Sequence, residues 1–316
     1  MPTPHTVVIV NPKSQGGAVG KRWPDLADLI GRILPFDEVR TSGPGDAIEL
    51  TRKALRGGAD RVVALGGDGT VNEVVNGFFD EAGVPIAPEA TFGLLPYGTG
   101  GDFRRTMNIP RALDEAAAII AGGHRRRVDL GKLTYVTASG QERTRLFANI
   151  ASFGVSGVVD RLVNESGKKL GGKLSFAIAS ARASWSYRNQ RVELVFDGEP
   201  SSRVELTINT VAVANGRFFG GGMMMAPEAE VDDGRFDVVA MGDFGLGDLL
   251  RASRRLYKGT HLTMDKVTHR RATVVEAAPL DPGTAVELDV DGENLGRLPA
   301  RFETVPGAVW MAVPPT

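Results

Sequence analysis

Hydrophobic positions in the first 130 or so residues alternate between short apolar runs and longer stretches with helical spacing. The apolar runs lie at residues 7–10, 62–65 and 92–95, and the helical patterns that follow them lie at residues 23–33, 71–79 and 112–121. Strands that are apolar on both faces and alternate with helices are typical of a parallel sheet covered on both sides. The pattern therefore predicts an α/β domain at the N-terminal end.

From about residue 133 the pattern changes to short β-rich runs separated by turn residues. These runs lie at residues 146–150, 192–196, 204–213, 236–240, 273–275, 286–290 and 309–313. Short strands at close spacing indicate an antiparallel sandwich or barrel. Residues from Lys173 to Tyr187 are the exception, because their apolar positions suit a helix. We expect a second, mainly β domain that begins near residues 130–135 without a flexible linker.

Composition narrows the class of protein further. The 316 residues are 42% hydrophobic and 24% charged, which is typical of a globular protein with room for two domains. The absence of cysteine excludes disulfides, thiolate metal sites and a cysteine nucleophile. A net charge of −1 provides no overall attraction for nucleic acid. No apolar run approaches the ~18 residues of a membrane span, so we expect a cytoplasmic protein without a transmembrane segment.

Three glycine-rich loops follow strands of the predicted α/β domain, at residues 11–17, 66–70 and 96–102. In a parallel sheet, all such strand-to-helix loops emerge at the same edge. Glycine lets backbone N–H groups approach an anion closely, and the N-terminus of the following helix adds partial positive charge. We expect Gly67 in particular to adopt a positive φ, which a β-branched residue would disfavour. Each loop alone would be an ordinary tight connection, but three at one edge predict a phosphate site.

Polar side chains within these loops add chemistry to the phosphate site. Thr70 and Thr99 can donate hydroxyl hydrogen bonds to phosphate oxygens. Asp68 would repel phosphate unless a divalent cation lies between them, or unless the carboxylate belongs to the reacting centre. Neither the glycine fingerprint of Rossmann dinucleotide-binding folds nor the P-loop motif occurs in the chain. The loops therefore indicate a phosphate site of another type.

Seven motifs between Val7 and Glu293 carry a family resemblance. In order, they read VVIVNPKSQGG, GGDGTVNEVVNG, LLPYGTGGDF, VDLGK, FANIASFG, APEAEVDDGRFDVV and DVDGE. This ordered set resembles the bacterial lipid kinases related to the diacylglycerol kinase catalytic domain and to sphingosine and ceramide kinases. The sequence GGDGT alone is also found in NAD kinases and, more loosely, in phosphofructokinases.

The resemblance implies a fold and cofactors. It implies a Rossmann-like or phosphofructokinase-like nucleotide-binding domain over residues 1–132, to which the C-terminal residues 300–316 return. It also implies an antiparallel β-sandwich over residues 133–299 that takes the lipid substrate. ATP and Mg²⁺ would be the cofactors, and the active site would lie in the cleft between the domains.

The resemblance also implies site residues at matching positions. The family's nucleotide contacts fall on the three loops, the start of the helix after residue 70, and one threonine. These positions are Asn11, Pro12, Lys13, Ser14, Gln15, Thr41, Gly66, Gly67, Asp68, Gly69, Thr70, Val71, Asn72, Glu73, Gly98 and Thr99.

The family's acidic residues map onto both domains. Its catalytic base corresponds to Glu293, and its acidic network corresponds to Asp68, Asp102, Asp129 and Asp291. Of these, Asp102 and Asp129 are assigned to the nucleotide site, whereas Asp68 and Asp291 are assigned to catalysis beside Glu293.

A structural magnesium site of the family maps to Glu230, Asp233 and Arg235, where backbone carbonyls could supply much of the coordination. The third loop departs from the family pattern, because Gly101 stands where Asn is usual. The hydrogen bonds of that amide are lost, so the group that they would orient, the nucleotide or Asp102, loses their support.

Two features have a simpler structural interpretation beside the functional one. Asp291-Gly292 taken alone is a strong signal for a hairpin turn, so that only its place in the motif order makes the next residue a base. Met223 to Met225 could be ordinary core residues or the lining of an adaptable acyl pocket.

Two basic stretches also leave alternatives open. Arg125 to Arg127 form either a solvated charge run or a surface that faces phosphate or anionic lipid. A helical stretch contains the basic residues Arg251, Arg254, Arg255 and Lys258. It is either an ordinary amphipathic helix or a contact with a negatively charged membrane surface.

These observations predict an ATP-dependent lipid kinase that transfers the γ-phosphoryl group to a hydroxyl of diacylglycerol or a related lipid. The enzyme would meet its lipid as a peripheral protein at the inner membrane surface, with no nucleic acid partner, and a homodimer remains open. The alternatives are an NAD kinase-like enzyme, a catalytically inactive nucleotide-binding regulator, and a lipid-binding protein without a nucleotide.

Overall fold

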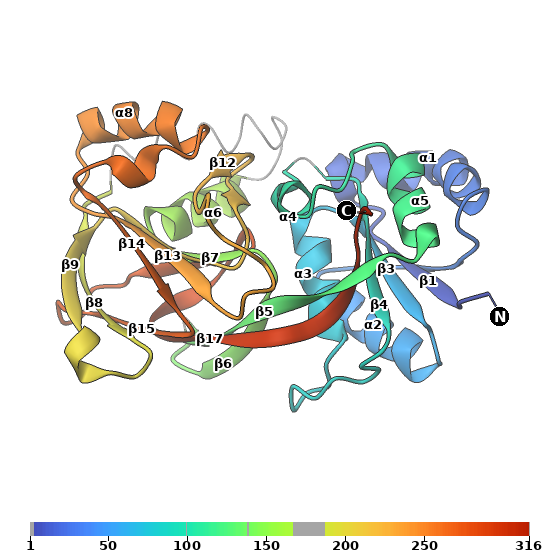
Figure 1. Cartoon of the computed structure of the whole chain (residues 1–316), viewed down its shortest axis with the longest axis horizontal. Helices are drawn as coiled ribbons and strands as arrows, with labels where there is room; N and C mark the ends of the chain where they lie inside the picture. The colour runs from blue at the N-terminus through green and yellow to red at the C-terminus, as the bar shows by residue number, and fades with distance from the viewer. Residues whose placement is uncertain (1–2, 99, 138, 167–186, 316) are drawn as a thin grey trace. The chain divides into compact units, whose positions relative to one another are not determined.

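The computed structural model of the chain describes residues 3–98, 100–137, 139–166 and 187–315 (Figure 1). The helix expected at Lys173–Tyr187 lies outside these residues, apart from Tyr187 itself.

The chain forms two compact units. The first unit comprises Met1–Val128 and Gly307–Thr316, and the second comprises Asp129–Pro306. Strands β5 (Arg125–Val136) and β17 (Glu293–Ala312) each contribute residues to both units. The chain therefore passes between the units within continuous strands, and its C-terminal end belongs to the first unit.

The first unit is built on a parallel sheet with the strand order β17-β4-β3-β1-β2. Its own strands are β1 (Thr6–Val10), β2 (Asp37–Arg40), β3 (Arg61–Gly66) and β4 (Thr91–Pro96). The β1 strand and most of β3 and β4 are buried, as their apolar runs predict. The hydrophobic pattern did not predict β2, because β2 is an edge strand whose Asp37, Glu38 and Arg40 face solvent.

In the described part of the first unit, helices follow β1 to β4. They are α1 (Ser14–Gly31), α2 (Asp46–Arg56), α3 (Asp68–Gly77), α4 (Asp102–Thr106) and α5 (Leu113–Gly122). α1 packs beside α5, and α2 packs beside α3 (Figure 1). The loops that precede α1, α3 and α4 follow β1, β3 and β4, so all three emerge at the C-terminal edge of the parallel sheet.

The second unit is antiparallel. Its strands, besides β5 and β17, are β6 (Glu142–Phe147), β7 (Ile150–Gly154), β8 (Gln190–Phe196), β9 (Val204–Ile208), β10 (Thr210–Ala214), β11 (Phe218–Phe219), β12 (Met223–Met224), β13 (Phe236–Met241), β14 (Val267–Ala272), β15 (Val274–Pro279) and β16 (Glu287–Val290). One path runs β14-β13-β10-β7-β16-β17, and β15, β8 and β9 extend it from β17. Its helices are α6 (Val155–Ser166), α8 (Leu246–Leu256), η1 (Pro200–Ser202) and η2 (His261–Thr263).

Besides a small group around Val159, two hydrophobic clusters form the core of the second unit in the residues that the structure describes. The larger one contains two stacked aromatic pairs, Phe147 with Phe236 and Phe153 with Phe302. The smaller one lies under α8 and includes the fully buried Met225. Met225 is therefore an ordinary core residue.

Two details of the predicted β pattern need correction. The run at residues 146–150 is interrupted, because β6 ends at Phe147 and β7 begins at Ile150. The run at residues 204–213 is two strands separated at Asn209. The domain boundary near residues 130–135 stays a prediction, and the chain there continues within β5.

The basic run Arg125–Arg127 has a structural role. The guanidinium groups of Arg125 and Arg127 lie 4.3 and 4.5 Å from the ring centre of Trp310, and both pair with Glu89. The cation–π contacts hold β5 against the C-terminal end of β17, and the ion pairs hold it to the segment before β4. Two of the three arginines are thus engaged within the first unit.

The predicted fold class is confirmed. The first unit is an α/β domain with parallel strands, and the second is an antiparallel β-sandwich domain. Among the described residues, no helix combines the length and the apolar character that crossing a membrane requires.

Candidate functional site

The first two glycine-rich loops are tied together through Asn11. Its backbone N–H donates to the carbonyl of Leu65 at 3.2 Å, and its side-chain amide donates to Thr70 Oγ1 at 3.1 Å. The amide oxygen accepts the backbone N–H of Lys13 at 3.0 Å. One asparagine therefore fixes the end of β1 and the start of α3 in a single arrangement.

The second and third loops touch through their backbones. A Cβ atom on Gly98 would lie 2.5 Å from the Cα atom of Gly67, and a Cβ on Gly66 would overlap the side chain of Thr70. Glycine at positions 66 and 98 is thus required by close contact. Gly67 itself has φ −98° and ψ −171°, which any residue adopts, so the expected positive φ at this position is wrong.

Asp68 joins the second loop to the third through hydrogen bonds. Its Oδ2 accepts the backbone N–H of Gly101 at 2.9 Å and that of Asp102 at 3.4 Å. Among the described residues, its Oδ1 makes no hydrogen bond. One oxygen therefore holds the loop, and the other is available as a ligand for a divalent cation, which prefers carboxylate oxygens.

Gly101 has a backbone conformation that asparagine, the usual residue of the family pattern, can also adopt. Its φ of 67° and ψ of 44° lie in the left-handed region, which glycine and asparagine adopt more readily than other residues. Its N–H still donates to Asp68. The departure from asparagine therefore removes the amide side chain but not the path of the loop or the support of Asp68.

Arginines surround the third loop, and the sequence reasoning missed them. Asp102 is buried, and its Oδ1 lies 2.5 Å from a guanidinium nitrogen of Arg105, which also donates to the carbonyl of Gly100. Arg104 and Arg111 line a small hollow together with the glycines of the second and third loops and Asp68. Burial lowers the pKa of Arg104. The available signal was the pair of arginines directly after Asp102-Phe103.

The other predicted nucleotide contacts make different hydrogen bonds within the chain. Gln15 has a φ of 50° and donates to the carbonyl of Gly98 at 3.4 Å, so it reaches the third loop. Lys13 donates to the carbonyl of Ser42 at 3.0 Å, beside the buried Thr41. The structure brings these residues to the same sheet edge as the glycine loops. Thr99 lies outside the described residues.

Glu73 has a different environment from the rest of this set. Its two carboxylate oxygens accept the backbone N–H groups of Gly45 at 2.9 Å and Ala47 at 3.1 Å. These groups lie at the N-terminus of α2, where a carboxylate is favourable. Glu73 therefore fixes α2 against α3, and its neighbours Val71 and Asn72 are buried in α3.

In the second unit, Asp291 supports the chain at a tight turn. Asp291 and Gly292 have φ values of 49° and 86°, as in the hairpin turns that favour Asp-Gly, and they join β16 to β17. The Asp291 carboxylate accepts three backbone N–H groups, from Ala148 at 2.9 Å, Asn149 at 3.1 Å and Ile150 at 3.0 Å. Asp291 thus fixes the backbone where β6 ends and β7 begins.

Glu293 begins β17 directly after this turn. Its side chain is 34% exposed, and one carboxylate oxygen lies 3.7 Å from the guanidinium of Arg145, a residue that sequence reasoning did not single out. The turn fixed by Asp291 and the neighbouring arginine restrict where this carboxylate points. Glu293 is therefore a positioned, partly exposed acid.

The glycine loops of the first unit and the acids around Glu293 lie in regions that match known protein families. A model of the diacylglycerol kinase catalytic domain matches residues 5–133, and a model of the YegS C-terminal NAD kinase beta sandwich-like domain matches residues 149–313. A diacylglycerol kinase of Bacillus subtilis (strain 168) is 30% identical over 263 residues, which cover 83% of this chain and 80% of that protein.

The chain belongs to the diacylglycerol kinase family of lipid kinases.

Other relatives of this family extend the match. A diacylglycerol kinase of Mycobacterium tuberculosis (strain ATCC 25618 / H37Rv) is 29% identical over 311 residues, covering 97% of this chain and 94% of that protein. A crystal structure of a candidate diacylglycerol kinase from Bacillus anthracis str. Sterne matches with a TM-score of 0.75 at 25% identity, covering 98% of each chain. The predicted family resemblance is confirmed. Membership of a kinase family implies, in general, the use of ATP and a divalent metal ion.

Asp129 and the candidate structural metal residues lie together in this diacylglycerol kinase-family chain. The carboxylate of the buried Asp129 accepts the N–H of Gly234 at 2.7 Å, and its backbone N–H donates to Val231. Asp129 therefore supports the turn that carries Asp233, and it does so within the second unit.

The three candidate metal residues differ in their contacts and in their exposure to solvent. Asp233 Oδ1 accepts the N–H of Arg235, while Glu230 and Arg235 are exposed. Within the described residues, neither Glu230 nor Asp233 belongs to a group of three metal-binding side chains. A magnesium ion at this turn would therefore need backbone carbonyls as ligands.

A neighbouring group of Glu228, Asp237 and His269 could in principle hold a cation. His269 Nε2 lies 2.6 Å from the buried Asp237, and this hydrogen bond raises the pKa of His269. Arg271 lies 3.5 Å from the same carboxylate. Because a guanidinium already balances this carboxylate, the arrangement is an ion-paired network rather than an open metal site.

The contact between the second and third loops generates a test with a matched control. We expect Gly98→Ala to destabilise the fold by about 1–3 kcal/mol, because its Cβ would be forced into the backbone of Gly67. Gly67→Ala should be nearly neutral, since its Cβ would lie 3.5 Å from the nearest atom, an ordinary contact. Urea unfolding of both variants measures the difference. Equal stability of the two would show that the loops do not touch in this way.

Proposed function

We propose that the protein transfers the γ-phosphoryl group of ATP to the hydroxyl group of diacylglycerol or a closely related lipid. The main support is the cradle of the first unit, in which three loops are tied edge to edge and Asp68 keeps one carboxylate oxygen free of hydrogen bonds among the described residues. The names of the relatives, which are diacylglycerol kinases, support the choice of acceptor.

The glycine loops suit the triphosphate of ATP. Backbone N–H groups at the N-termini of α3 and α4 supply hydrogen-bond donors and partial positive charge without side chains that would block the approach of phosphate. Arg104 and Arg111 add full positive charge beside the same loops. Phosphoryl transfer mainly requires positioning and charge neutralisation, and this arrangement provides both.

Asp68 would hold the divalent ion. Bound magnesium would supply positive charge to the β- and γ-phosphates, and Asp68 Oδ1 offers the kind of oxygen that it prefers. The two backbone N–H groups on Oδ2 keep the carboxylate from rotating. The carboxylate is therefore oriented before any ligand arrives.

Glu293 would act as the general base. As the lipid hydroxyl oxygen bonds to the γ-phosphorus and the bond to the β–γ bridging oxygen breaks, the hydroxyl proton passes to the Glu293 carboxylate. Arg145 and the turn held by Asp291 position this side chain. We propose that the protein meets its lipid as a peripheral enzyme at the cytoplasmic face of the membrane.

An NAD kinase-like activity is the alternative with a specific observation behind it, because the second unit matches a domain described as NAD kinase-like. Incubation with γ-labelled ATP and a panel of acceptors separates the two. The panel holds dispersed diacylglycerol, phosphatidylglycerol, a sphingoid base, a polyprenol and NAD. We expect label in diacylglycerol or another lipid. Label in NAD alone would overturn the proposal, and ATP binding without any product would favour an inactive regulator.

The charge of Asp68 can be separated from its hydrogen bonds. Asp68→Asn keeps an oxygen acceptor for Gly101 but removes the negative charge, so we expect a loss of ~10²-fold or more in kcat with little change in stability. Asp68→Ala should lose a similar amount of activity and, in addition, about 1 kcal/mol of unfolding free energy. Steady-state kinetics and urea unfolding check both. Retention of more than about a tenth of wild-type kcat by Asp68→Asn would rule out the charge role.

Glu293 and Asp291 should respond in opposite ways to the loss of their charge. Glu293→Gln preserves size and polarity, so we expect kcat to fall ~10²–10⁴-fold while ATP affinity and melting temperature stay nearly unchanged.

Asp291→Asn is the matched control two residues away. Asparagine has one acceptor oxygen where Asp291 uses both, so we expect a loss of about 1–3 kcal/mol of stability. If Glu293→Gln turns over normally, or loses activity only together with a lower melting temperature, Glu293 is not the base.

A further inference from the structure

The helix α8 (Leu246–Leu256) has two different faces. Ala252 and Leu256 are buried against the core of the second unit, as an amphipathic helix requires. On the opposite side, Leu250 is 78% exposed, and Tyr257, directly after the helix, is 57% exposed. Two large apolar side chains therefore stand in solvent on the outward face.

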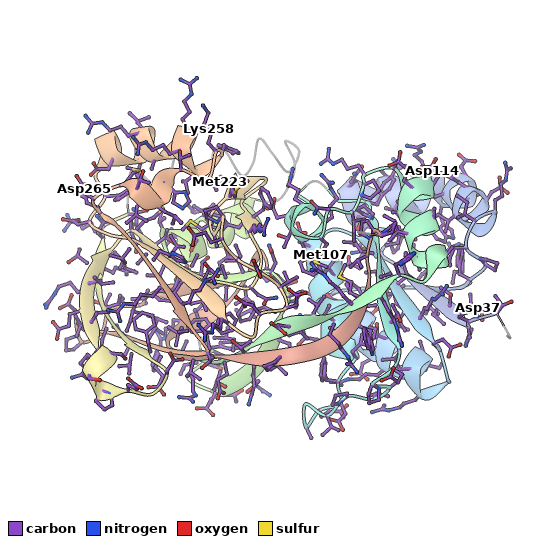
Figure 2. The ribbon with its side chains drawn as sticks, viewed as in Figure 1. Asp37, Met107, Asp114, Met223, Lys258 and Asp265 are labelled. Atoms are coloured by element: carbon purple, nitrogen blue, oxygen red, sulfur yellow. The ribbon has the colours of Figure 1, made fainter. Side chains whose placement is uncertain are left out.

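Basic side chains share this outward face. The side chains of Arg251, Arg254 and Lys258 make no hydrogen bond or ion pair with any of the residues that the structure describes. The side chain of Lys258 points away from the ribbon of the second unit (Figure 2). These residues stand three and four positions apart along the helix, a spacing at which like charges repel by about 0.2–0.5 kcal/mol per pair.

An arginine of α2 shows how a basic residue on a helix can be balanced. In α2, Arg52 pairs with Glu49 at 2.7 Å and with Glu81 at 2.8 Å. From residue 247 to residue 258, by contrast, the chain contains a single acid, Asp248, and this acid is paired with Lys266 at 2.8 Å. Arg251 shares the attraction of Asp248 with Lys266, whereas Arg254 and Lys258 have no acidic partner among the described residues, at a cost to helix stability.

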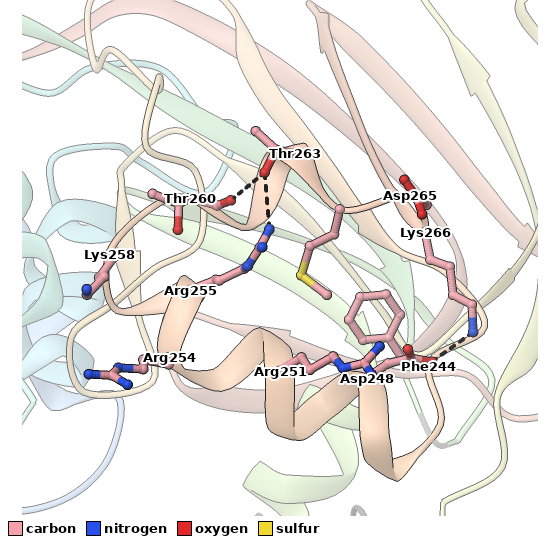
Figure 3. Close-up of a pocket in the computed structure, with 11 residues that line it drawn as sticks. Phe244, Asp248, Arg251, Arg254, Arg255, Lys258, Thr260, Thr263, Asp265 and Lys266 are labelled. Atoms are coloured by element: carbon pink, nitrogen blue, oxygen red, sulfur yellow. Dashed lines mark hydrogen bonds and ion pairs between the residues drawn. The ribbon is translucent and has the colours of Figure 1, made fainter.

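A hollow of about 840 Å³ adjoins the helix (Figure 3). Phe244 and Met264 provide apolar surface within it, and basic side chains of α8 line it. Arg255 reaches across to Thr263 at 3.3 Å, whereas Arg254 and Lys258 extend to the same side of the helix without such a partner. The hollow offers room for a phosphate-bearing headgroup next to the basic side chains of α8.

We propose that α8 docks the second unit onto a bilayer that contains anionic phospholipid. Arg251, Arg254 and Lys258 lie against lipid phosphates, and Leu250 and Tyr257 enter the headgroup region. This inference rests on the proposed lipid kinase function, because a lipid acceptor resides in a bilayer. It goes further by assigning the contact to one helix face.

The mixture of groups favours a bilayer over other anions. An interfacial helix combines cations with leucine and an aromatic residue on its exposed side, and tyrosine prefers the headgroup level. A nucleic acid surface would need positive charge over a broader area, whereas the whole chain has a net charge of −1. The attraction must therefore come from this local patch.

Binding to vesicles tests the electrostatic part. The test compares phosphatidylcholine vesicles that contain phosphatidylglycerol with vesicles of phosphatidylcholine alone, without ATP. We expect wild type to bind the anionic vesicles, and the variant with Arg251→Gln, Arg254→Gln and Lys258→Gln to bind roughly a hundredfold more weakly, at about 1 kcal/mol per basic residue.

The matched control removes the same charge from exposed strand positions of the second unit, through Lys132→Gln, Arg143→Gln and Arg297→Gln. We expect this control to bind nearly as well as wild type. Failure of wild type to bind anionic vesicles, or equal losses in both triple variants, would overturn the assignment to α8.

Insertion of the apolar pair has its own readout. Because the chain has no cysteine, Leu250→Cys gives a unique site for an environment-sensitive fluorophore. We expect its emission to shift to the blue on anionic vesicles, whereas the same label on Val84→Cys, an exposed residue of the first unit, should not shift. A shift absent at position 250, with binding competed equally by single-stranded DNA, would identify a general polyanion surface and contradict the proposal.

Activity assays on soluble and on vesicle-borne substrate distinguish a failure of the docking proposal from a failure of the proposed kinase function. With a short-chain diacylglycerol in solution, the α8 variant should keep the kcat of wild type, and it should lose activity only on vesicle-borne substrate. Wild type without activity on either substrate would reject the kinase proposal, whatever the vesicle binding shows. Equal activity of both proteins on vesicles would reject the docking role alone.

Discussion

The geometry of the candidate phosphate site depends on a contact between backbones. Gly98 approaches Gly67 so closely that no side chain fits at position 98, and the carbonyl of Gly66 accepts the N–H of Tyr97 at 2.9 Å. This contact fixes β3 and β4 at their C-terminal ends and brings the N-terminus of α4 within reach of Asp68. The orientation of Asp68 then follows from two hydrogen bonds to that N-terminus. Glycine in these loops therefore serves the contact between loops as well as the approach of a ligand.

In the second unit, two acids of one short motif have separate structural environments. Asp291 uses its carboxylate to hold three backbone N–H groups where β6 gives way to β7, and Glu293 two residues later remains partly exposed. One acid of the Asp-Gly-Glu motif thus builds the turn, and the next presents a carboxylate. The hairpin interpretation applies to Asp291 and Gly292, and the catalytic role that we propose falls on a different residue of the same motif, Glu293.

The hydrophobic pattern predicted the fold class because the buried strands of the parallel sheet are apolar along their whole length. It missed β2, whose exposed edge position leaves no apolar signature, and it merged β9 with β10 because Asn209 interrupts them by a single residue. The glycine loops were placed correctly at one sheet edge, since parallel connectivity dictates that placement. The reason for individual glycines was not predictable. Whether a glycine serves a positive φ, as at Gly101, or a close approach, as at Gly98, depends on neighbours distant in sequence.

Side-chain roles were harder to predict than positions. Glu73 and Asp129 occupy family motif positions, yet the first holds the N-terminus of α2 and the second holds the turn at Gly234. Arg104, Arg111 and Arg145 carry charge beside the key acids and have no motif of their own. Their positions beside these acids result from tertiary packing, which the periodicity of apolar residues along the sequence does not reveal.

The central claim is that the triphosphate of ATP rests on the glycine loops with a divalent ion held by Asp68. Calorimetric titration of ATP with and without Mg²⁺, on wild type and on Asp68→Asn, tests it most directly. The account predicts that Mg²⁺ tightens ATP binding to wild type and has little effect on the variant. An equal effect of Mg²⁺ on both proteins, or wild type that does not bind ATP, would contradict it.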